Sequence, residues 1–273
     1  MFLHRALRIF AVNATLTLQY TMKIALLQTN IRWNDPQANI DKAQRLMASQ
    51  PGANLYLLPE MWGTGFDTNP RTEAPEAALL LGAMQEMAAK ANAHVGGSMA
   101  VEDNGLFFNR FYLVAPDGSH VHYDKRHLFA YGGEHLAFEP GKERVIARCG
   151  DIRILLLTCY DLRFPVFTRC RDDYDMIACI ASWPEKRHVA WDSLLRARAI
   201  ENQCVVCGVN RVGKDAHSHY IGGSVCINAY GDYLVRLGEK EQAAIAAPHW
   251  EKQHEFRKKF PVLADADSFT LNL

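Results

Sequence analysis

Strand-like and helix-like segments alternate along the chain, and this alternation restricts the fold more than any other feature of the sequence. The apolar run at 23–28 predicts a strand, and Asp35, which precedes a proline, predicts the start of a helix. The continuous aliphatic run at 152–157 is typical of a strand that is buried on both faces. Segments 111–115 and 120–123 flank a Pro-Asp-Gly turn and predict a direct hairpin. Together these patterns predict a single α/β domain with a mixed sheet, in two packed layers.

The charge balance limits the kinds of partner that such a domain can have. The 273 residues include 30 Lys and Arg against 30 Asp and Glu, so the formal net charge is zero. A balanced charge argues against nucleic acid and anionic membrane surfaces as partners. The longest apolar stretches, such as 176–183, are well short of the roughly 20 residues that a membrane span needs. We therefore expect a soluble protein whose partner is a small molecule.

The cysteines indicate the compartment. There are seven of them, an odd number spread over a long chain, which does not suit a secreted disulfide framework. Cys179 and Cys226 lie inside apolar runs, where a free thiol behaves as a small buried hydrophobic group. The sequence therefore favours the reducing cytoplasm.

The first 21 residues differ from the rest of the chain, because they include basic residues and no acidic ones. Such a segment could be a targeting peptide, but polar residues at 13, 15, 17 and 19 interrupt its apolar centre. Met22 then opens a clear strand pattern, so an extension upstream of the real start is the alternative that we favour. We expect residues 1–21 to be an N-terminal extension and residues 22–273 to be one domain.

Three reactive side chains each follow an apolar strand pattern. Glu60 comes after the run at 55–58, Lys125 after 120–123, and Cys159 after 152–157. Any one of them, taken alone, is more often an ordinary surface or core residue. In α/β folds, however, active sites assemble at the carboxyl ends of strands, so the three together predict one site.

These residue types complement one another in acyl transfer. A thiol is nucleophilic only as the thiolate, so Cys159 needs a base. The Glu60 carboxylate can take the thiol proton and later deliver that proton to a leaving amine. The Lys125 ammonium can stabilise the negative oxygen of a tetrahedral intermediate. If Cys159 begins a sharp strand-to-helix turn, the backbone N–H of Tyr160 is a natural second donor. This chemistry requires no metal.

Three motifs that contain these residues resemble the signature segments of the nitrilase, or carbon–nitrogen hydrolase, superfamily. They are LPEMWGTGF (58–66), YDKRHLF (123–129) and LLLTCYDLRFP (155–165), in the expected order. The resemblance extends from about Met22 to near Phe269. It implies an α-β-β-α sandwich in which Glu60 is the general base and acid, Lys125 the oxyanion donor and Cys159 the nucleophile. It also implies that Glu134, in AYGGEHLAFEPG, helps to position the triad.

Further segments are similar to the bacterial omega-amidase subgroup, namely 123–141, 182–203, 208–213 and 256–269. This resemblance implies hydrolysis of the terminal amide of 2-oxoglutaramate and 2-oxosuccinamate to ammonia and a dicarboxylate, through a thioester and without a cofactor. It also implies at least a homodimer, with the C-terminal tail crossing to the partner. Two alternatives remain open: another carbon–nitrogen hydrolase, such as a carbamoyl-amine hydrolase or a general aliphatic amidase, and a catalytically silent binding or scaffold protein.

An omega-amide of an oxo acid carries a carboxylate, so a cation is expected near the pocket. Arg163 and Arg187 are the candidates, although Arg163 could instead form a structural ion pair with Asp161 or another acid. Tyr131 and Trp183 could form walls of the pocket or simply pack in the fold.

Two other patterns favour ordinary structural interpretations over metal binding. The CxxC at 204–207 lies in an apolar strand without a second CxxC, and strand alternation points its two thiols to opposite faces. His120 with His122, and His217 with His219, have i, i+2 spacing and are expected to be exposed histidines on a strand edge or loop.

Overall fold

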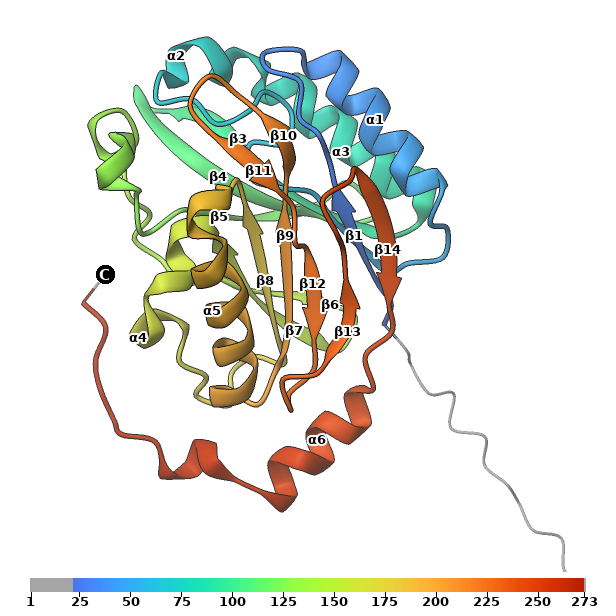
Figure 1. Cartoon of the computed structure of the whole chain (residues 1–273), viewed down its shortest axis with the longest axis vertical. Coiled ribbons are helices and arrows are strands. Elements are labelled where there is room, and N and C mark those ends of the chain that lie inside the picture. The colour runs from blue at the N-terminus through green and yellow to red at the C-terminus, as the bar shows by residue number, and fades with distance from the viewer. Residues whose placement is uncertain (1–21, 273) are drawn as a thin grey trace, which may run out of the picture.

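Two six-stranded sheets form the centre of the protein (Figure 1). The computed structural model describes residues 22–272, so the predicted extension at 1–21 lies outside the described residues. In spatial order, the first sheet contains β14 (Gln242–Ala246), β1 (Ile24–Gln28), β2 (Leu55–Leu57), β3 (His94–Asp103), β4 (Leu106–Val114) and β5 (His120–Asp124). The second contains β13 (Tyr233–Arg236), β12 (Val225–Ile227), β9 (Val205–Asn210), β8 (Met176–Ala181), β7 (Ile152–Thr158) and β6 (Ile146–Cys149).

Both sheets are mixed, as the sequence predicts. The inner strands β1, β2 and β3 are parallel, and so are β7, β8 and β9, whereas the outer strands pair antiparallel. A short hairpin of β10 (Val212–Lys214) and β11 (His219–Ile221) stands apart from both sheets. The strand patterns led us to expect one mixed sheet, and the presence of two is a correction. Periodicity identifies strands but does not determine which of them pair.

Helices cover the outer faces of the two sheets. Those on the first sheet are α1 (Pro36–Ala48) and α3 (Ala77–Ala91), and α5 (His188–Glu201) packs on the second. The short helices are α2 (Pro70–Glu73), α4 (Pro165–Thr168) and α6 (Trp250–Lys259), with 3-10 turns η1 (Ala74–Glu76), η2 (Ala130–Gly132), η3 (Glu134–Leu136), η4 (Cys159–Arg163), η5 (Glu185–Arg187) and η6 (Val262–Asp265). As predicted, Asp35 caps α1, and its carboxylate accepts from the Ala38 N–H at 3.1 Å.

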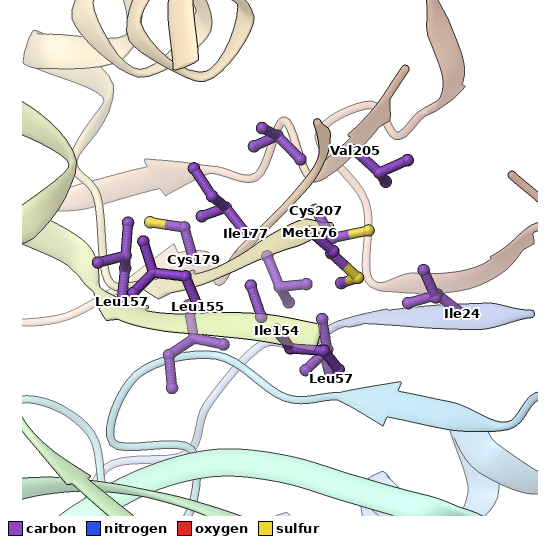
Figure 2. Close-up of a cluster of buried hydrophobic side chains, with 14 of the residues drawn as sticks. Ile24, Leu57, Ile154, Leu155, Leu157, Met176, Ile177, Cys179, Val205 and Cys207 are labelled. Atoms are coloured by element: carbon purple, nitrogen blue, oxygen red, sulfur yellow. The ribbon is translucent and has the colours of Figure 1, made fainter. Parts of the chain in front are cut away.

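The side chains of β1 show how these layers are built. Ala25 and Leu27 face the α1 and α3 helices, whereas Ile24 and Leu26 face the second sheet. Figure 2 draws part of the layer between the sheets, where Ile24 and Leu57 of the first sheet share a cluster with Ile154 of the second. Alternate residues thus fill two different apolar layers, and the result is the α-β-β-α sandwich that the family resemblance implies.

The C-terminal segment runs along the outside of this sandwich (Figure 1). The indole N–H of Trp250 in α6 donates to the Met22 carbonyl at 3.2 Å, and the Gln253 amide donates to the Asp175 carbonyl at 2.7 Å. These bonds join α6 to the beginning of the described chain and to the residue that precedes β8, a central strand of the second sheet. Within residues 22–272, no helix has the length and apolar character required to cross a membrane.

Candidate active site

The carboxyl ends of strands from both sheets meet at one point, and the predicted reactive residues lie there. Glu60 follows β2, Lys125 follows β5 and Cys159 follows β7. The Lys125 ammonium donates to Glu60 Oε1 at 2.9 Å, and all three residues line one cavity. The structure therefore brings together the three residues that sequence reasoning selected. Glu134, which the family resemblance had singled out, binds the same ammonium through its carboxylate.

Cys159 occupies a sharp turn between β7 and η4. Its φ angle is +49°, in the left-handed region that a residue with a Cβ rarely adopts. The turn is held by Asp161, whose carboxylate accepts from the Thr158 N–H at 2.9 Å and from the Tyr123 hydroxyl at 2.8 Å. This matches the predicted strand-to-helix turn and places the backbone N–H of Tyr160 immediately after the thiol-bearing residue. Such strain is typical of functional sites, where the surrounding structure maintains it.

One suggestion about this turn is wrong, namely the ion pair between Arg163 and Asp161. The acceptor positions of Asp161 are occupied by other donors, including the His127 backbone N–H at 2.9 Å and its ring Nδ1 at 2.8 Å. The Arg163 guanidinium lies instead over the Trp183 ring, 4.9 Å from its centre. Sequence proximity suggested the pair, but the turn points the two side chains to different partners.

Glu60 has one acceptor position left after its hydrogen bonds are counted. Its Oε1 accepts from Lys125 and from the Asn109 amide, both at 2.9 Å, and its Oε2 accepts from the Ser182 backbone N–H at 2.9 Å. A carboxylate has about four acceptor positions. The remaining one, on Oε2, can take a proton from Cys159 or from a water molecule.

The ammonium of Lys125 is buried between the two carboxylates. Burial alone would lower the pKa of Lys125, but the charges of Glu134 and Glu60 outweigh it and raise that pKa well above its ordinary value. Burial is the largest influence on Glu134 and raises its pKa, while the Lys125 charge opposes the rise. Glu134 also accepts from the Phe129 backbone N–H at 2.6 Å, which favours its ionised form. Lys125 therefore stays charged in the resting site.

The Cys159 thiol is protonated in the resting site. Burial raises its pKa well above the ordinary value, the Glu60 charge adds to the rise, and the Lys125 charge opposes it. A thiol in this state is a weak nucleophile without a base. Because Glu60 keeps a free acceptor position, the arrangement can remove the thiol proton as the sulfur attacks. The site combines a nucleophile, a base and a cationic donor.

Sequence reasoning missed two residues of the site. Asn109 is a buried polar residue that lies next to Arg110 in the mainly apolar β4, and Ser182 directly follows the apolar β8. The Ser182 hydroxyl also donates to the Glu60 carbonyl at 3.1 Å. Ser182 could have been found by the rule that selected Glu60 and Cys159, since it too follows a buried strand. The signal for Asn109 was weaker, namely a polar pair, Asn109 and Arg110, between apolar residues of one strand.

The cavity beside these residues has a volume of about 710 Å³. All four predicted substrate-binding residues line it, namely Arg163, Arg187, Tyr131 and Trp183. Trp183 is 2% exposed and forms part of a wall, whereas Tyr131 is 89% exposed and stands at the mouth. Another cavity of the same volume lies between the C-terminal tail and the body, but it contains none of the reactive residues.

The two arginines of the cavity have no acidic partner among residues 22–272. The Arg163 guanidinium lies over Trp183, and the Arg187 guanidinium lies 5.0 Å from the centre of the Phe129 ring. Stacking on a ring holds a guanidinium in place while its N–H groups stay available. The cavity can therefore offer two cations to an anionic ligand.

The patterns that we set aside as structural occupy ordinary positions. In the described part of the chain, no group of three or more His, Cys, Asp or Glu side chains could hold a metal ion. His219 pairs with Glu185 at 2.8 Å, and Cys207 lies opposite Cys226 on the neighbouring strand.

Comparison with known proteins adds relatives of similar sequence and fold. Residues 23–252 match the family described as carbon-nitrogen hydrolase. The chain is 40% identical to "Omega-amidase YafV" of Yersinia enterocolitica, over 92% of this chain and 99% of that protein. It is 32% identical to "2-oxoglutaramate amidase" of Bacillus subtilis, over 89% of this chain and 96% of that protein. The fold is similar to the crystal structure of a CN-hydrolase superfamily protein from Xanthomonas campestris, which carries an arsenic adduct in its active site. The two chains are 37% identical in sequence, and the TM-score is 0.86 over 92% of this chain and 99% of that one.

Proposed function

The chain belongs to the carbon–nitrogen hydrolase family, and within it we propose an omega-amidase that hydrolyses 2-oxoglutaramate and 2-oxosuccinamate. As a member of this family it is a hydrolase of carbon–nitrogen bonds other than peptide bonds. The observation that carries the proposal is a single cavity that joins Glu60, Lys125 and Cys159 to two arginines without acidic partners among residues 22–272. The omega-amidase and 2-oxoglutaramate amidase relatives support the same substrate class.

The proposed reaction begins with the thiol. Glu60 removes the Cys159 proton as the sulfur bonds to the amide carbonyl carbon, and the resulting oxyanion is held by Lys125 and the Tyr160 backbone N–H. The carbon–nitrogen bond then breaks, and the leaving group takes the proton from Glu60 and departs as ammonia. This step leaves an acyl thioester on Cys159.

Hydrolysis of the thioester completes the cycle. Glu60 is again a carboxylate, and the acceptor position vacated by the first proton can orient and deprotonate a water molecule. The hydroxide bonds to the thioester carbon, the carbon–sulfur bond breaks, and Cys159 recovers a proton. The product is the dicarboxylate 2-oxo acid. Only residues of this chain take part in either step.

We further propose that Arg163 and Arg187 bind the substrate carboxylate at the end remote from the amide. Both guanidinium groups line the cavity and lie over aromatic rings, so their N–H groups are preoriented. Replacing Arg187 with Gln should raise KM for 2-oxoglutaramate more than it lowers kcat, because the carboxylate lies away from the reacting carbon. Simple amides that lack a carboxylate should show little change.

The decisive experiment measures ammonia release from a panel of substrates. The panel contains the two oxo-amides, glutamine, asparagine, simple amides, nitriles and carbamoyl amines. We expect the oxo-amides to give the highest kcat/KM, Cys159→Ala to abolish turnover, and Glu60→Gln to reduce it severely. A preference for carbamoyl amines or simple amides would overturn the substrate proposal, and full activity of either variant would overturn the mechanism.

Thiol titration distinguishes an enzyme from a catalytically silent scaffold. Cys159 is partly exposed, whereas the other six cysteines are buried. An active site predicts one thiol that reacts much faster than the others in the native protein. If no fast-reacting thiol appears, the scaffold alternative is favoured.

The assembly and location of the protein are also proposals. We propose a homodimer in the cytoplasm, as the family resemblance and the seven free thiols suggest. Leu136 and Val189 support a covered face, since these apolar side chains are 82% and 81% exposed in a single chain. Light scattering of the purified protein tests the dimer, and a monomeric mass at micromolar concentration would refute it.

A further inference from the structure

Asn109 lies in β4, and its buried side chain is enclosed by the catalytic groups. Its Nδ2 donates to Glu60 Oε1 at 2.9 Å and to Glu134 Oε1 at 3.2 Å. Its backbone carbonyl accepts from the Lys125 N–H at 3.0 Å. One residue therefore holds three members of the site.

The two oxygens bound by Asn109 are also bound by Lys125. The Lys125 ammonium donates to Glu60 Oε1 at 2.9 Å and to Glu134 Oε1 at 3.0 Å, and its third bond reaches Glu134 Oε2 at 2.9 Å. An ammonium has three N–H groups, so all of them are occupied in the resting site. To stabilise an oxyanion, the ammonium must turn at least one of them away from a glutamate.

We propose that Asn109 is a positioning residue that keeps Glu60 and Glu134 hydrogen bonded while Lys125 turns toward the oxyanion. This inference rests on the proposed acyl-transfer function of the site. A buried carboxylate oxygen that loses its donor is costly, and the Asn109 amide prevents that loss at both Oε1 atoms. Because the amide is neutral, it does this without a charge that would compete for the oxyanion.

The orientation of the amide supports this role. Asn109 Oδ1 is buried and has no hydrogen-bond partner within the described range 22–272. The opposite orientation would place this oxygen against two carboxylate oxygens, which repel it. The side chain thus leaves its own acceptor unpaired in order to present both N–H groups to the glutamates. An apolar residue would avoid that penalty, which is consistent with a functional reason for the amide.

The test compares Asn109→Leu with the unaltered enzyme. Leucine has a similar volume but no donor, so kcat should fall by about 10- to 100-fold, the effect of losing a hydrogen bond to a charged group. KM should change little, because Asn109 is absent from the residues that line the cavity. The acid limb of the kcat/KM profile should move to higher pH by about one unit, because carboxylates that lose a donor bind protons more tightly.

A matched control is Asn202→Leu. Asn202 is equally buried and bonds to the Arg198 carbonyl and the Cys170 N–H, away from the catalytic residues. This variant should lose stability yet keep the kinetic pH profile. If Asn109→Leu behaves in the same way, with kcat within about twofold and an unshifted acid limb, Asn109 has only a structural role and the proposal is wrong.

Alkylation of Cys159 provides a readout that needs no amide substrate. Its reaction with iodoacetamide requires loss of the thiol proton, so the acid limb of the alkylation rate should shift in Asn109→Leu as it does in turnover. The unaltered protein could fail to hydrolyse the oxo-amides while Asn109→Leu still shifts the acid limb of the alkylation rate. That result would refute the proposed substrate and support the role of Asn109. If the leucine variant does not fold, isosteric Asn109→Asp takes its place, and an unshifted acid limb in that variant refutes the proposal.

Discussion

Replacing Glu73 with Gln should stabilise the protein increasingly as the pH rises. Glu73 ends α2, is 1% exposed, and has two carboxyl oxygens without a hydrogen-bond partner among residues 22–272. Burial, with the Asp67 charge adding to it, raises the pKa of Glu73 from 4.5 to about 9. The nearby backbone N–H of Asp67 opposes the rise in the Glu73 pKa. Its effect is limited, because neither Glu73 carboxyl oxygen has a hydrogen bond of ordinary geometry among residues 22–272. The folded protein therefore contains a neutral carboxylic acid at pH 7.

The sign and size of the effect follow from proton linkage. Well below pH 4.5 the folded and unfolded chains both hold the proton, so ionisation of Glu73 makes no contribution to stability. Between pH 4.5 and about 9 the unfolded chain ionises while the folded one stays neutral, so the free energy of unfolding falls by about 1.4 kcal/mol per pH unit. The loss is about 3 kcal/mol at pH 7 and about 6 kcal/mol at pH 9, and it is constant at higher pH.

Glutamine has the same shape and is neutral in both states, so the variant should escape this loss. Its amide has one more unpaired N–H than the acid, which adds a penalty that does not vary with pH. The free energy of unfolding of both proteins is measured by chemical denaturation at several pH values. The penalty from the extra N–H cancels when the stability differences at two pH values are compared. The stability gained by Glu73→Gln should be about 4 kcal/mol larger at pH 8 than at pH 5.

The exposed Glu102 provides the matched control, and Glu102→Gln should show no such pH dependence. A stability difference between Glu73→Gln and the unaltered protein that stays constant from pH 5 to pH 8 would refute the reasoning. It would mean that Glu73 is ionised in the folded state.

Three other predictions concern the framework of the site. Asp161→Asn should lower the free energy of unfolding by about 2 kcal/mol and also lower kcat, because the turn at Cys159 loses charge-assisted hydrogen bonds. An unchanged kcat would show that the turn does not depend on the charge of Asp161. In Glu60→Gln, the rate of Cys159 alkylation should keep rising with pH beyond the pH at which an ordinary thiol is fully ionised, because burial raises the Cys159 pKa. A plateau at the pH of an ordinary thiol would contradict this. Gly141→Ala should lower the free energy of unfolding by about 3 kcal/mol through overpacking, because the added Cβ would lie 2.0 Å from a backbone oxygen. Gly238→Ala is the control: its Cβ would have open space, so thermal unfolding should be unchanged.

The three candidate catalytic residues could be selected from the sequence because each follows a strand pattern. Glu60 and Cys159 follow apolar runs that form the inner parallel strands β2 and β7, whereas Lys125 follows the more polar edge strand β5. Chemical complementarity then selected these three from many other polar residues. The family motifs added Glu134, and the structure shows its carboxylate on the same ammonium.

The contacts around these residues could not be predicted in the same way. The proposed pairing of Arg163 with Asp161 was wrong because the turn directs one side chain to Trp183 and the other to His127. Asn109 was missed because its partners are 49 and 25 residues away in the chain. The local pattern of apolar and polar residues does not show which partners these side chains have.

By itself, the sequence determined the α/β class, the positions of most strands and helices, and the chemistry of the site. These depend on periodicity and residue type, which are local properties of the chain. Only the tertiary structure decided which strands pair within each sheet, that the two glutamates share one ammonium, and that the Cys159 thiol is protonated at rest. The physical reason is that strand pairing, burial and charge coupling depend on distances between segments far apart in the chain, and only the packed fold sets those distances.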